Sequence, residues 1–124
     1  MYRRVQRFEP GDPQAVEHLR EHGYCVVAAA VSGEEAERVV GLLWDWLEEV
    51  TWGKVRRGEP STYQHWPPDI GNTGILPYYG VGQSEALWAL RRAPRVQQAF
   101  ASVWGTQDLI TSYDGAVVFR PWGE

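Results

Sequence analysis

One amphipathic helix constrains the fold of this chain more than any other feature. Ser32 and Glu35 match the capping box, in which each side chain accepts a hydrogen bond from the backbone N–H of the other residue. The apolar residues that follow recur at spacings of three and four, so a helix over 33–50 has one apolar face. These residues are Ala36, Val39, Val40, Leu43, Leu47 and Val50. Trp44 and Trp46 widen this face, and we expect it to pack against a sheet rather than a cofactor.

Two shorter elements precede this helix. Asp12 is placed to cap a helix over Pro13–His22, and Gly23 is placed to end it. Residues 24–28 form a short β-branched run, which predicts a strand buried on both faces with Cys25 in the core. Residues 1–50 are therefore expected to form a helix, a strand and a helix.

The last third of the chain returns to regular structure. Helices are predicted over 84–105. Asp114 and Gly115 lie between β-rich runs, which predicts a β-hairpin over 108–121. The expected fold class is α+β, in a single domain over 1–124 that stops inside a sheet. Because an open sheet edge is normally paired or covered, we expect self-association through this edge.

Composition places the chain among globular proteins. Its 124 residues are 44% hydrophobic, which suffices for one packed core. The net charge of -4 comes from interspersed acidic and basic residues, so no basic surface for nucleic acid is predicted. A single cysteine excludes an internal disulfide, and no stretch approaches the roughly twenty apolar residues of a membrane span. We expect a soluble cytoplasmic protein that binds neither nucleic acid nor membrane.

Residues 51–83 break the helical pattern with glycine, proline and aromatic residues. A loop of this length is often a lid or a binding loop. Tyr63, His65, Trp66 and Tyr79 are therefore candidates for lining the entrance of a pocket for a small-molecule substrate. The alternative is that the aromatic side chains anchor the loop over a sheet. A lone histidine such as His65 is more often a packing or hydrogen-bonding residue.

Two histidines on the first predicted helix suggest a metal site. His18 and His22 are four residues apart, in the order of an inverted zinc-protease motif. Spacing predicts no third ligand, so we expect two solvated surface histidines and assign no metal ligand.

The predicted hairpin carries a second group of candidates, which are Ser112, Asp114 and Arg120. Arg120 could hold a carboxylate in a bidentate pair, and Ser112 could donate a hydrogen bond to one. We therefore expect these three residues to contact a cosubstrate or a substrate. The alternative assigns Asp114 to the turn and Arg120 to the surface of a strand.

Short motifs run along the whole chain in a characteristic order. They are Glu21-His-Gly-Tyr-Cys-Val-Val, Val31-Ser-Gly-Glu-Glu35, Trp66-Pro-Pro, Gly82-Gln, Trp88-Ala-Leu-Arg91, Pro94-Arg-Val, the segment 100–109, Ser112-Tyr-Asp-Gly115 and Arg120-Pro121. This order resembles the N-terminal part of phytanoyl-CoA dioxygenase-like proteins, and 88–121 is its more specific portion. The resemblance implies the first strands of a double-stranded β-helix, the jelly-roll or cupin-like fold, with Fe(II) and 2-oxoglutarate as cofactors.

Members of that family bind iron through a His-x-Asp pair and a distant second histidine. The three histidines of this chain are followed two positions later by Arg20, Tyr24 and Pro67, so no iron ligand and no catalytic residue is assigned. We expect an N-terminal fragment of a dioxygenase, truncated before the metal motif and inactive alone. The alternative is a non-catalytic ligand-binding or protein-interaction module that buries the hairpin edge against a partner.

Overall fold

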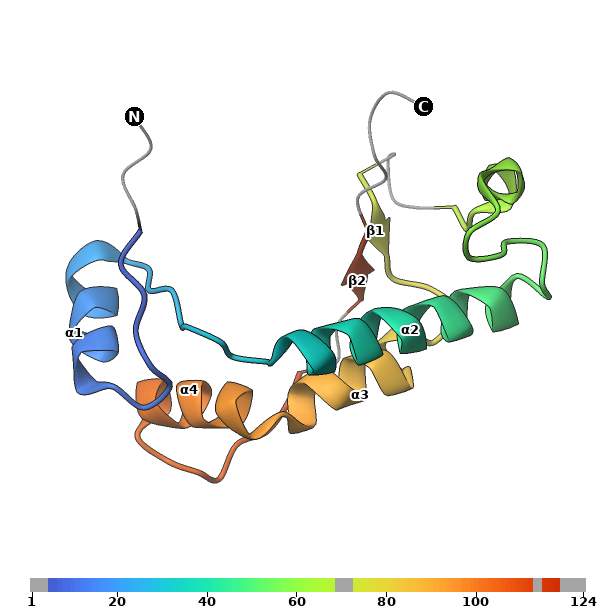
Figure 1. Ribbon diagram of the computed structural model, residues 1–124. Coiled ribbons are helices and arrows are strands. Elements are labelled where there is room, and N and C mark those ends of the chain that lie inside the picture. Colours follow the sequence, from blue (N-terminus) through green and yellow to red (C-terminus); the bar gives the residue numbers. More distant parts are fainter. Residues whose placement is uncertain (1–4, 69–72, 113–114, 119–124) are drawn as a thin grey trace. The chain divides into compact units, whose positions relative to one another are not determined.

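The computed structural model describes residues 5–68, 73–112 and 115–118. In these residues the chain combines α-helices and short 3₁₀ helices with a two-stranded sheet, an α+β arrangement (Figure 1). The elements are α1 (Pro13–His22), α2 (Gly33–Val50), η1 (Pro60–His65), β1 (Ile75–Leu76), η3 (Val81–Gln83), α3 (Glu85–Arg92), α4 (Pro94–Trp104) and β2 (Ala116–Val117).

These elements form two compact units, and each is described by itself. Unit 1 consists of the described residues within Met1–Ala36 and Leu90–Thr111, and unit 2 of those within Glu37–Ala89 and Ser112–Glu124. Across the part of the chain that the structure describes, no helix combines the length and the apolar character that crossing a membrane would require.

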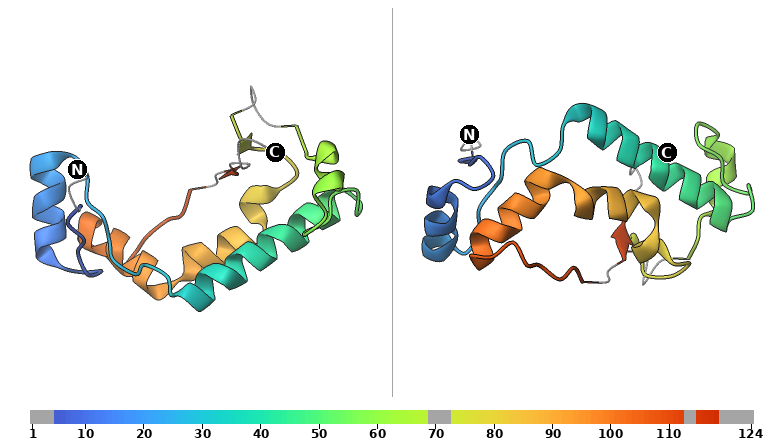
Figure 2. Two further views of the ribbon diagram at one scale, coloured as in Figure 1. Left: turned by 45° about the horizontal axis from the view of Figure 1, so that its top comes forward. Right: turned by 90° about the horizontal axis from the view of Figure 1, so that it is seen from below.

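In unit 1, α1 and α4 lie side by side (Figure 2). The carboxylate of Asp12 accepts a hydrogen bond of 2.9 Å from the backbone N–H of Gln14, as expected of an N-cap. Gly23 adopts the left-handed conformation and donates its N–H to the Leu19 carbonyl. The predicted bounds of this helix are therefore confirmed.

The strand predicted over 24–28 was wrong. Among the described residues this segment forms a single parallel bridge, in which Phe8 pairs with Val27. The N–H of Phe8 bonds to the Val26 carbonyl at 2.9 Å, and that of Ala28 to the Phe8 carbonyl at 2.7 Å. Cys25 is only half-buried. A β-branched run favours extended backbone, but it does not indicate how many neighbouring strands exist to bury it.

One arginine holds the connection between α1 and α2 onto α4. The Nε of Arg95 donates to the Ala29 carbonyl at 2.7 Å, and its Nη2 lies 2.7 Å from the Glu9 carboxylate. Ala29 has a φ of 44°, which is unfavourable for a residue with a side chain. Arg95 thus satisfies a carbonyl in a strained turn.

The start of α2 has the predicted capping box. The Ser32 N–H donates to the Glu35 carboxylate at 2.6 Å, and the Glu35 N–H donates to the Ser32 hydroxyl at 3.1 Å. These bonds from the backbone and side chain of Ser32, with a smaller contribution from the charge of Arg95, lower the pKa of Glu35.

Unit 2 is built on the C-terminal part of the predicted apolar face of α2, whereas Val40 on that face is 54% exposed. Its buried cluster consists of Trp46, Leu47, Val55, Leu76, Val81 and Ala116. Val55 and Val81 are fully buried, although they come from outside the long helices and strands. The prediction that this helix face packs against a sheet is confirmed for Leu76 and Ala116, and the segment after the helix supplies the rest of its cover.

The sheet of unit 2 pairs two segments that are far apart in the sequence. β1 is antiparallel to β2, with Ile75 opposite Val117 and Leu76 opposite Ala116. The predicted hairpin over 108–121 differs from this pairing, since the described residues 106–112 form no strand. An Asp-Gly pair indicates a local reversal, but it does not determine which strand a following segment joins.

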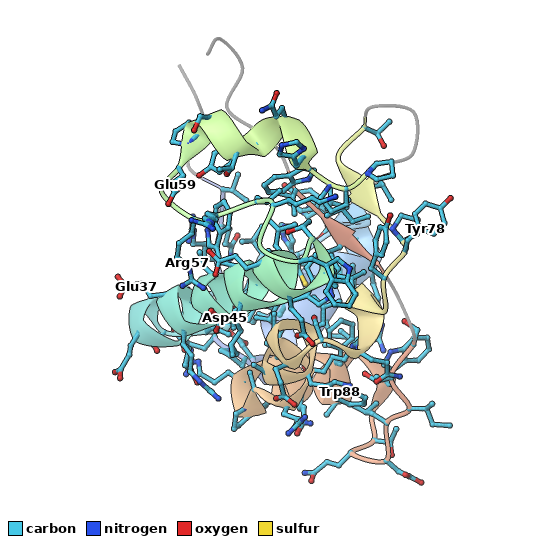
Figure 3. The ribbon with its side chains drawn as sticks, turned by 90° about the vertical axis from the view of Figure 1, so that its right-hand side faces the viewer. Glu37, Asp45, Arg57, Glu59, Tyr78 and Trp88 are labelled. Carbon is cyan, nitrogen blue, oxygen red and sulfur yellow. The ribbon has the colours of Figure 1, made fainter. Side chains whose placement is uncertain are left out.

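The segment 51–83 was predicted to be a loop, yet it contains η1, β1 and η3. The Thr51 hydroxyl donates to the Leu47 carbonyl at 2.8 Å and accepts from the Val55 N–H at 3.2 Å. The Arg57 guanidinium lies beside the Asp45 carboxylate on α2, and its Nε is 3.6 Å from Glu48 (Figure 3). Side-chain bonds of this kind fasten an irregular segment without a long helix or strand.

The lowered pKa of Glu35 predicts an acid-dependent loss of stability. A lowered pKa in the folded state stabilises the fold above the unfolded-state pKa, and this contribution disappears as the pH falls through the folded-state pKa. Glu35→Gln should therefore be less stable than the wild type at pH 7, and the difference should vanish in acid. Urea unfolding at several pH values measures it. Glu34→Gln removes a charge from the same turn but leaves the capping box intact, so an equal pH effect there would contradict the account.

The close approach of β2 to β1 predicts a steric requirement at Gly115. A Cβ there would lie 2.7 Å from the Leu76 carbonyl oxygen and 3.2 Å from the Pro77 Cα. Gly115→Ala should lower the free energy of unfolding by about 1–3 kcal/mol, the usual cost of overpacking. Gly41→Ala within α2 is the control, because a Cβ there meets nothing within 4 Å and alanine favours helix. The midpoint of denaturant unfolding should fall for Gly115→Ala and rise for Gly41→Ala. An unchanged midpoint for Gly115→Ala would refute the steric requirement.

Candidate functional site

The first candidate site is a three-ring cluster over the core of unit 2. Trp44 of α2 lies 5.7 Å from Tyr63 and 5.9 Å from Trp66, measured between ring centroids, and the last two are 6.1 Å apart. All three rings are half-buried against the core cluster. Aromatic rings at these separations attract each other beyond their burial, so the cluster fastens η1 to α2.

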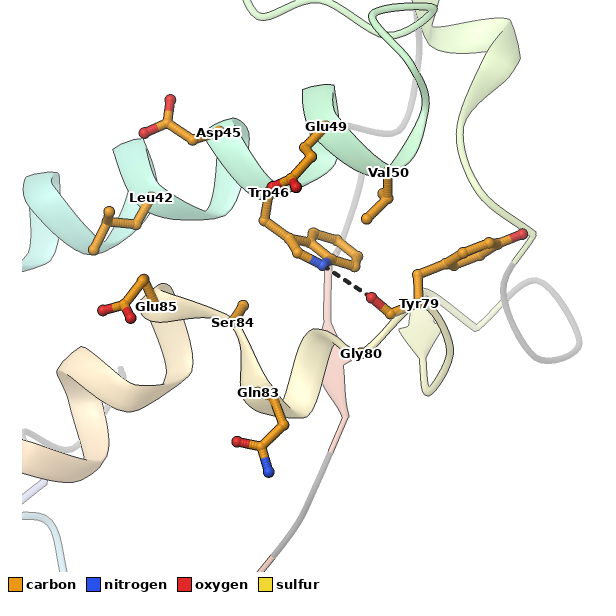
Figure 4. A pocket seen from close by; sticks show the side chains of 10 residues that line it. All are labelled: Leu42, Asp45, Trp46, Glu49, Val50, Tyr79, Gly80, Gln83, Ser84 and Glu85. Atoms are coloured by element: carbon orange, nitrogen blue, oxygen red, sulfur yellow. Dashed lines mark hydrogen bonds between the residues drawn. The ribbon is translucent and has the colours of Figure 1, made fainter.

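The second candidate is a groove between α2 and the segment 79–85, with a volume of about 380 Å³ (Figure 4). α2 contributes five residues, and the segment that leads into α3 contributes the other five. The lining consists of Leu42, Asp45, Trp46, Glu49, Val50, Tyr79, Gly80, Gln83, Ser84 and Glu85.

Trp46 positions the two walls of this groove. Its indole ring points from α2 toward the opposite segment, and Nε1 donates a hydrogen bond of 3.3 Å to the Tyr79 carbonyl (Figure 4). Tyr79 and Gly80 both have positive φ, 59° and 68°, so the chain turns sharply at this carbonyl. The Tyr79 ring points away from Trp46 and is half exposed. The groove therefore has an aromatic floor and one exposed aromatic ring at its rim.

Two polar side chains that line the groove, those of Gln83 and Ser84, accept hydrogen bonds from residues of α3. The Ser84 hydroxyl accepts from the Leu87 N–H at 3.4 Å, as the side chain of an N-cap residue does. The Gln83 side-chain oxygen accepts from the Trp88 indole at 2.7 Å. Both groups thus hold the wall in place.

Charge in the groove is entirely acidic. Asp45, Glu49 and Glu85 line it, and the lining contains no histidine, cysteine, lysine or arginine. Asp45 points away from the opposite wall and pairs with Arg57. A nucleophile needs an adjacent base or a lowered pKa, and no such pair lines the groove. The groove is an open, acidic depression, and its own residues supply no evident chemistry.

The structure brings together only some of the predicted entrance residues. Tyr63 and Trp66 share one cluster, whereas Tyr79 lies at the groove. The centroid of the Tyr79 ring is 6.5 Å from that of Tyr78. His65 ends η1 and is exposed. The anchoring role that the sequence offered as an alternative accounts for Tyr63 and Trp66, and the entrance role remains a prediction for all four residues.

The hairpin candidates are only partly described. Ser112 is exposed, and Asp114 and Arg120 lie outside the described residues. Their contact with a cosubstrate or substrate remains a prediction.

Sequence reasoning missed the groove itself. The one local signal is a pair of glycines, Gly80 before η3 and Gly82 within it, which is typical of a close turn.

Iron does not fit the described residues. No three side chains of histidine, cysteine, aspartate or glutamate gather there in a way that could hold a metal ion. A non-haem iron site of the facial-triad type needs two histidines and a carboxylate. The described part of the chain therefore provides no iron centre, and no reaction step is derived through one.

Comparison with known proteins finds two curated relatives. The chain is 31% identical over 106 residues to "Ava biosynthesis cluster protein O" of Aspergillus versicolor, an alignment that covers 85% of this chain and 34% of that protein. It is 25% identical over 111 residues to "Putative phytanoyl-CoA dioxygenase" of Dictyostelium discoideum, covering 85% of this chain and 31% of that protein. The chain thus spans about a third of the length of the curated relatives it matches. No protein-family model matches the chain, and no solved structure matches it with significance.

The hydrogen bond between the two walls predicts a measurable effect of Trp46. Trp46→Phe keeps an aromatic ring but removes the indole N–H that donates to the Tyr79 carbonyl. The free energy of unfolding should therefore fall by about 1 kcal/mol or more. Trp52→Phe is the matched control, because the Trp52 side chain is 91% exposed. Urea unfolding compares the two variants. Equal midpoints would show that the bond does not hold the groove together.

Proposed function

We propose that this chain is the N-terminal portion of an Fe(II)- and 2-oxoglutarate-dependent oxygenase of the phytanoyl-CoA dioxygenase-like family. The observation that carries the proposal is the 25% identity, over 85% of the chain, to a protein of that name. The motif order along the sequence points to the same family independently. The other relative is named for a biosynthesis cluster, which supports a small-molecule substrate.

The sheet of unit 2 supports the fold that this proposal requires. β1 and β2 are antiparallel although they are separated in sequence, and among the described residues each has a single hydrogen-bonded neighbour. Two strands alone are marginal, and unpaired edges are normally extended or covered. In the proposed protein these strands belong to a double-stranded β-helix, and α2 packs its apolar face against them.

The part of the chain described here would act through binding and support. In this family Fe(II) and 2-oxoglutarate supply the oxidising chemistry when bound, and the protein positions the substrate. Tyr79 at the rim of the groove, with Tyr63, His65 and Trp66 around η1, would line the substrate entrance. Ser112, Asp114 and Arg120 would contact the cosubstrate or the substrate.

The full-length gene product tests the proposal. It should contain a His-x-Asp or His-x-Glu pair after residue 124, followed by a second histidine that completes the facial triad. With Fe(II) and O₂, the purified protein should convert 2-oxoglutarate to succinate and CO₂, and alanine at the first of these histidines should abolish the release of succinate. The 124-residue chain is the matched control and should release none.

A full-length protein that lacks this triad would overturn the oxygenase proposal. The ligand-binding or protein-interaction alternative would then be preferred, because neither needs iron.

A further inference from the structure

Four aromatic rings form a cluster at the C-terminal end of α1, in unit 1. Two of them, His18 and His22, belong to the helix, and Phe8 and Tyr24 come from the segments beside it. The His18 ring lies 5.1 Å from Phe8, 5.3 Å from Tyr24 and 4.3 Å from His22, measured between centroids. His18 is half-buried, so the prediction of two solvated histidines was wrong for this residue. Its ring packs against Phe8 and Tyr24, which come from the segments before and after α1.

The two histidines face the same side of the helix. Residues four apart are neighbours on a helix surface, and these rings are in contact. Neither ring makes a hydrogen bond to another residue in the described part of the chain. The nearest carboxylate is that of Glu21, with Oε2 3.8 Å from the Nε2 of His22. In the described part of the chain, no hydrogen bond therefore competes with a metal ion for the nitrogens of these two rings.

We propose that His18 and His22 form a two-histidine site for a divalent transition-metal ion, with water completing the coordination. Imidazole suits Zn(II), Cu(II) and Ni(II), and it binds zinc at about 2.0–2.1 Å. Two rings on one ion must therefore lie close together, and the centroids of the His18 and His22 rings are 4.3 Å apart. The site is independent of the proposed oxygenase function, because it uses two protein ligands on one helix rather than a facial triad.

The position of the pair on α1 favours a cation. His22 is the last residue of the helix, and the C-terminal end of a helix carries partial negative charge. The Glu21 carboxylate adds a full negative charge nearby. A metal ion bridging residues four apart would also close the last turn of α1, so binding should stabilise unit 1.

The test is isothermal titration calorimetry of the untagged 124-residue chain, first with Ni(II) and then, in a separate titration, with Zn(II). We expect one ion per chain at pH 7.5 and loss of binding at pH 5, because the histidines must be neutral to bind. Paramagnetic Ni(II) should broaden the NMR signals of α1, Phe8 and Tyr24, whose rings or backbone adjoin the pair.

Three histidine variants decide the proposal. His22→Gln should weaken Ni(II) binding by roughly tenfold or more, since even mutations outside the ligand shell often cost about 10- to 100-fold. The matched control is His65→Gln, which removes the exposed histidine of η1 and should leave the affinity unchanged. His18→Gln should abolish binding. Because the His18 ring also packs against Phe8 and Tyr24, the decision rests on His22→Gln.

The His22 side chain is 44% exposed, so His22→Gln should stay folded by circular dichroism and keep the test decisive. Wild-type affinity in folded His22→Gln would overturn the proposal, as would equal weakening in His65→Gln. A chain that binds neither Ni(II) nor Zn(II) at pH 7.5 would overturn it as well.

Discussion

The structure of unit 2 depends on burying one face of α2 with a segment that contains little regular structure. Trp46 and Leu47 need apolar partners, and the fully buried side chains of Val55 and Val81 supply them from 51–83. Burial of side chains of this size contributes about 1.5–3 kcal/mol each, more than the capping and surface interactions around them. The segment is therefore part of the core and not an appendage to it.

Burying an irregular segment brings its backbone groups out of water, and these groups need partners. Thr51 shows how the chain meets this need, because one hydroxyl both donates to the Leu47 carbonyl and accepts from the buried Val55 amide. At the surface, the Arg57 side chain pairs with the Asp45 and Glu48 carboxylates of α2. The three-ring cluster of Trp44, Tyr63 and Trp66 adds apolar contact. The part of the segment that follows α2 is consequently held to this helix from several directions.

Elements with local causes could be predicted from the sequence, and elements with distant causes could not. The bounds of α1 and the capping box of α2 follow from residues within one turn. The pairing of Ile75 with Val117 and the packing of His18 on Phe8 depend on segments that meet only after folding. The groove arises in the same way from α2 and 79–85, so the pattern of either segment alone does not indicate it.

Whether 51–83 is a fixed wall or a mobile lid matters for any function of the groove, because a lid must open at low cost. Native-state hydrogen exchange measured by NMR tests this directly. We predict that the amides of Val55 and Val118, bonded to Thr51 and Gly74, exchange with the same free energy of opening as the helical amide of Leu47. Exchange of Val55 and Val118 at the rate of an unstructured peptide, while Leu47 stays protected, would contradict the account.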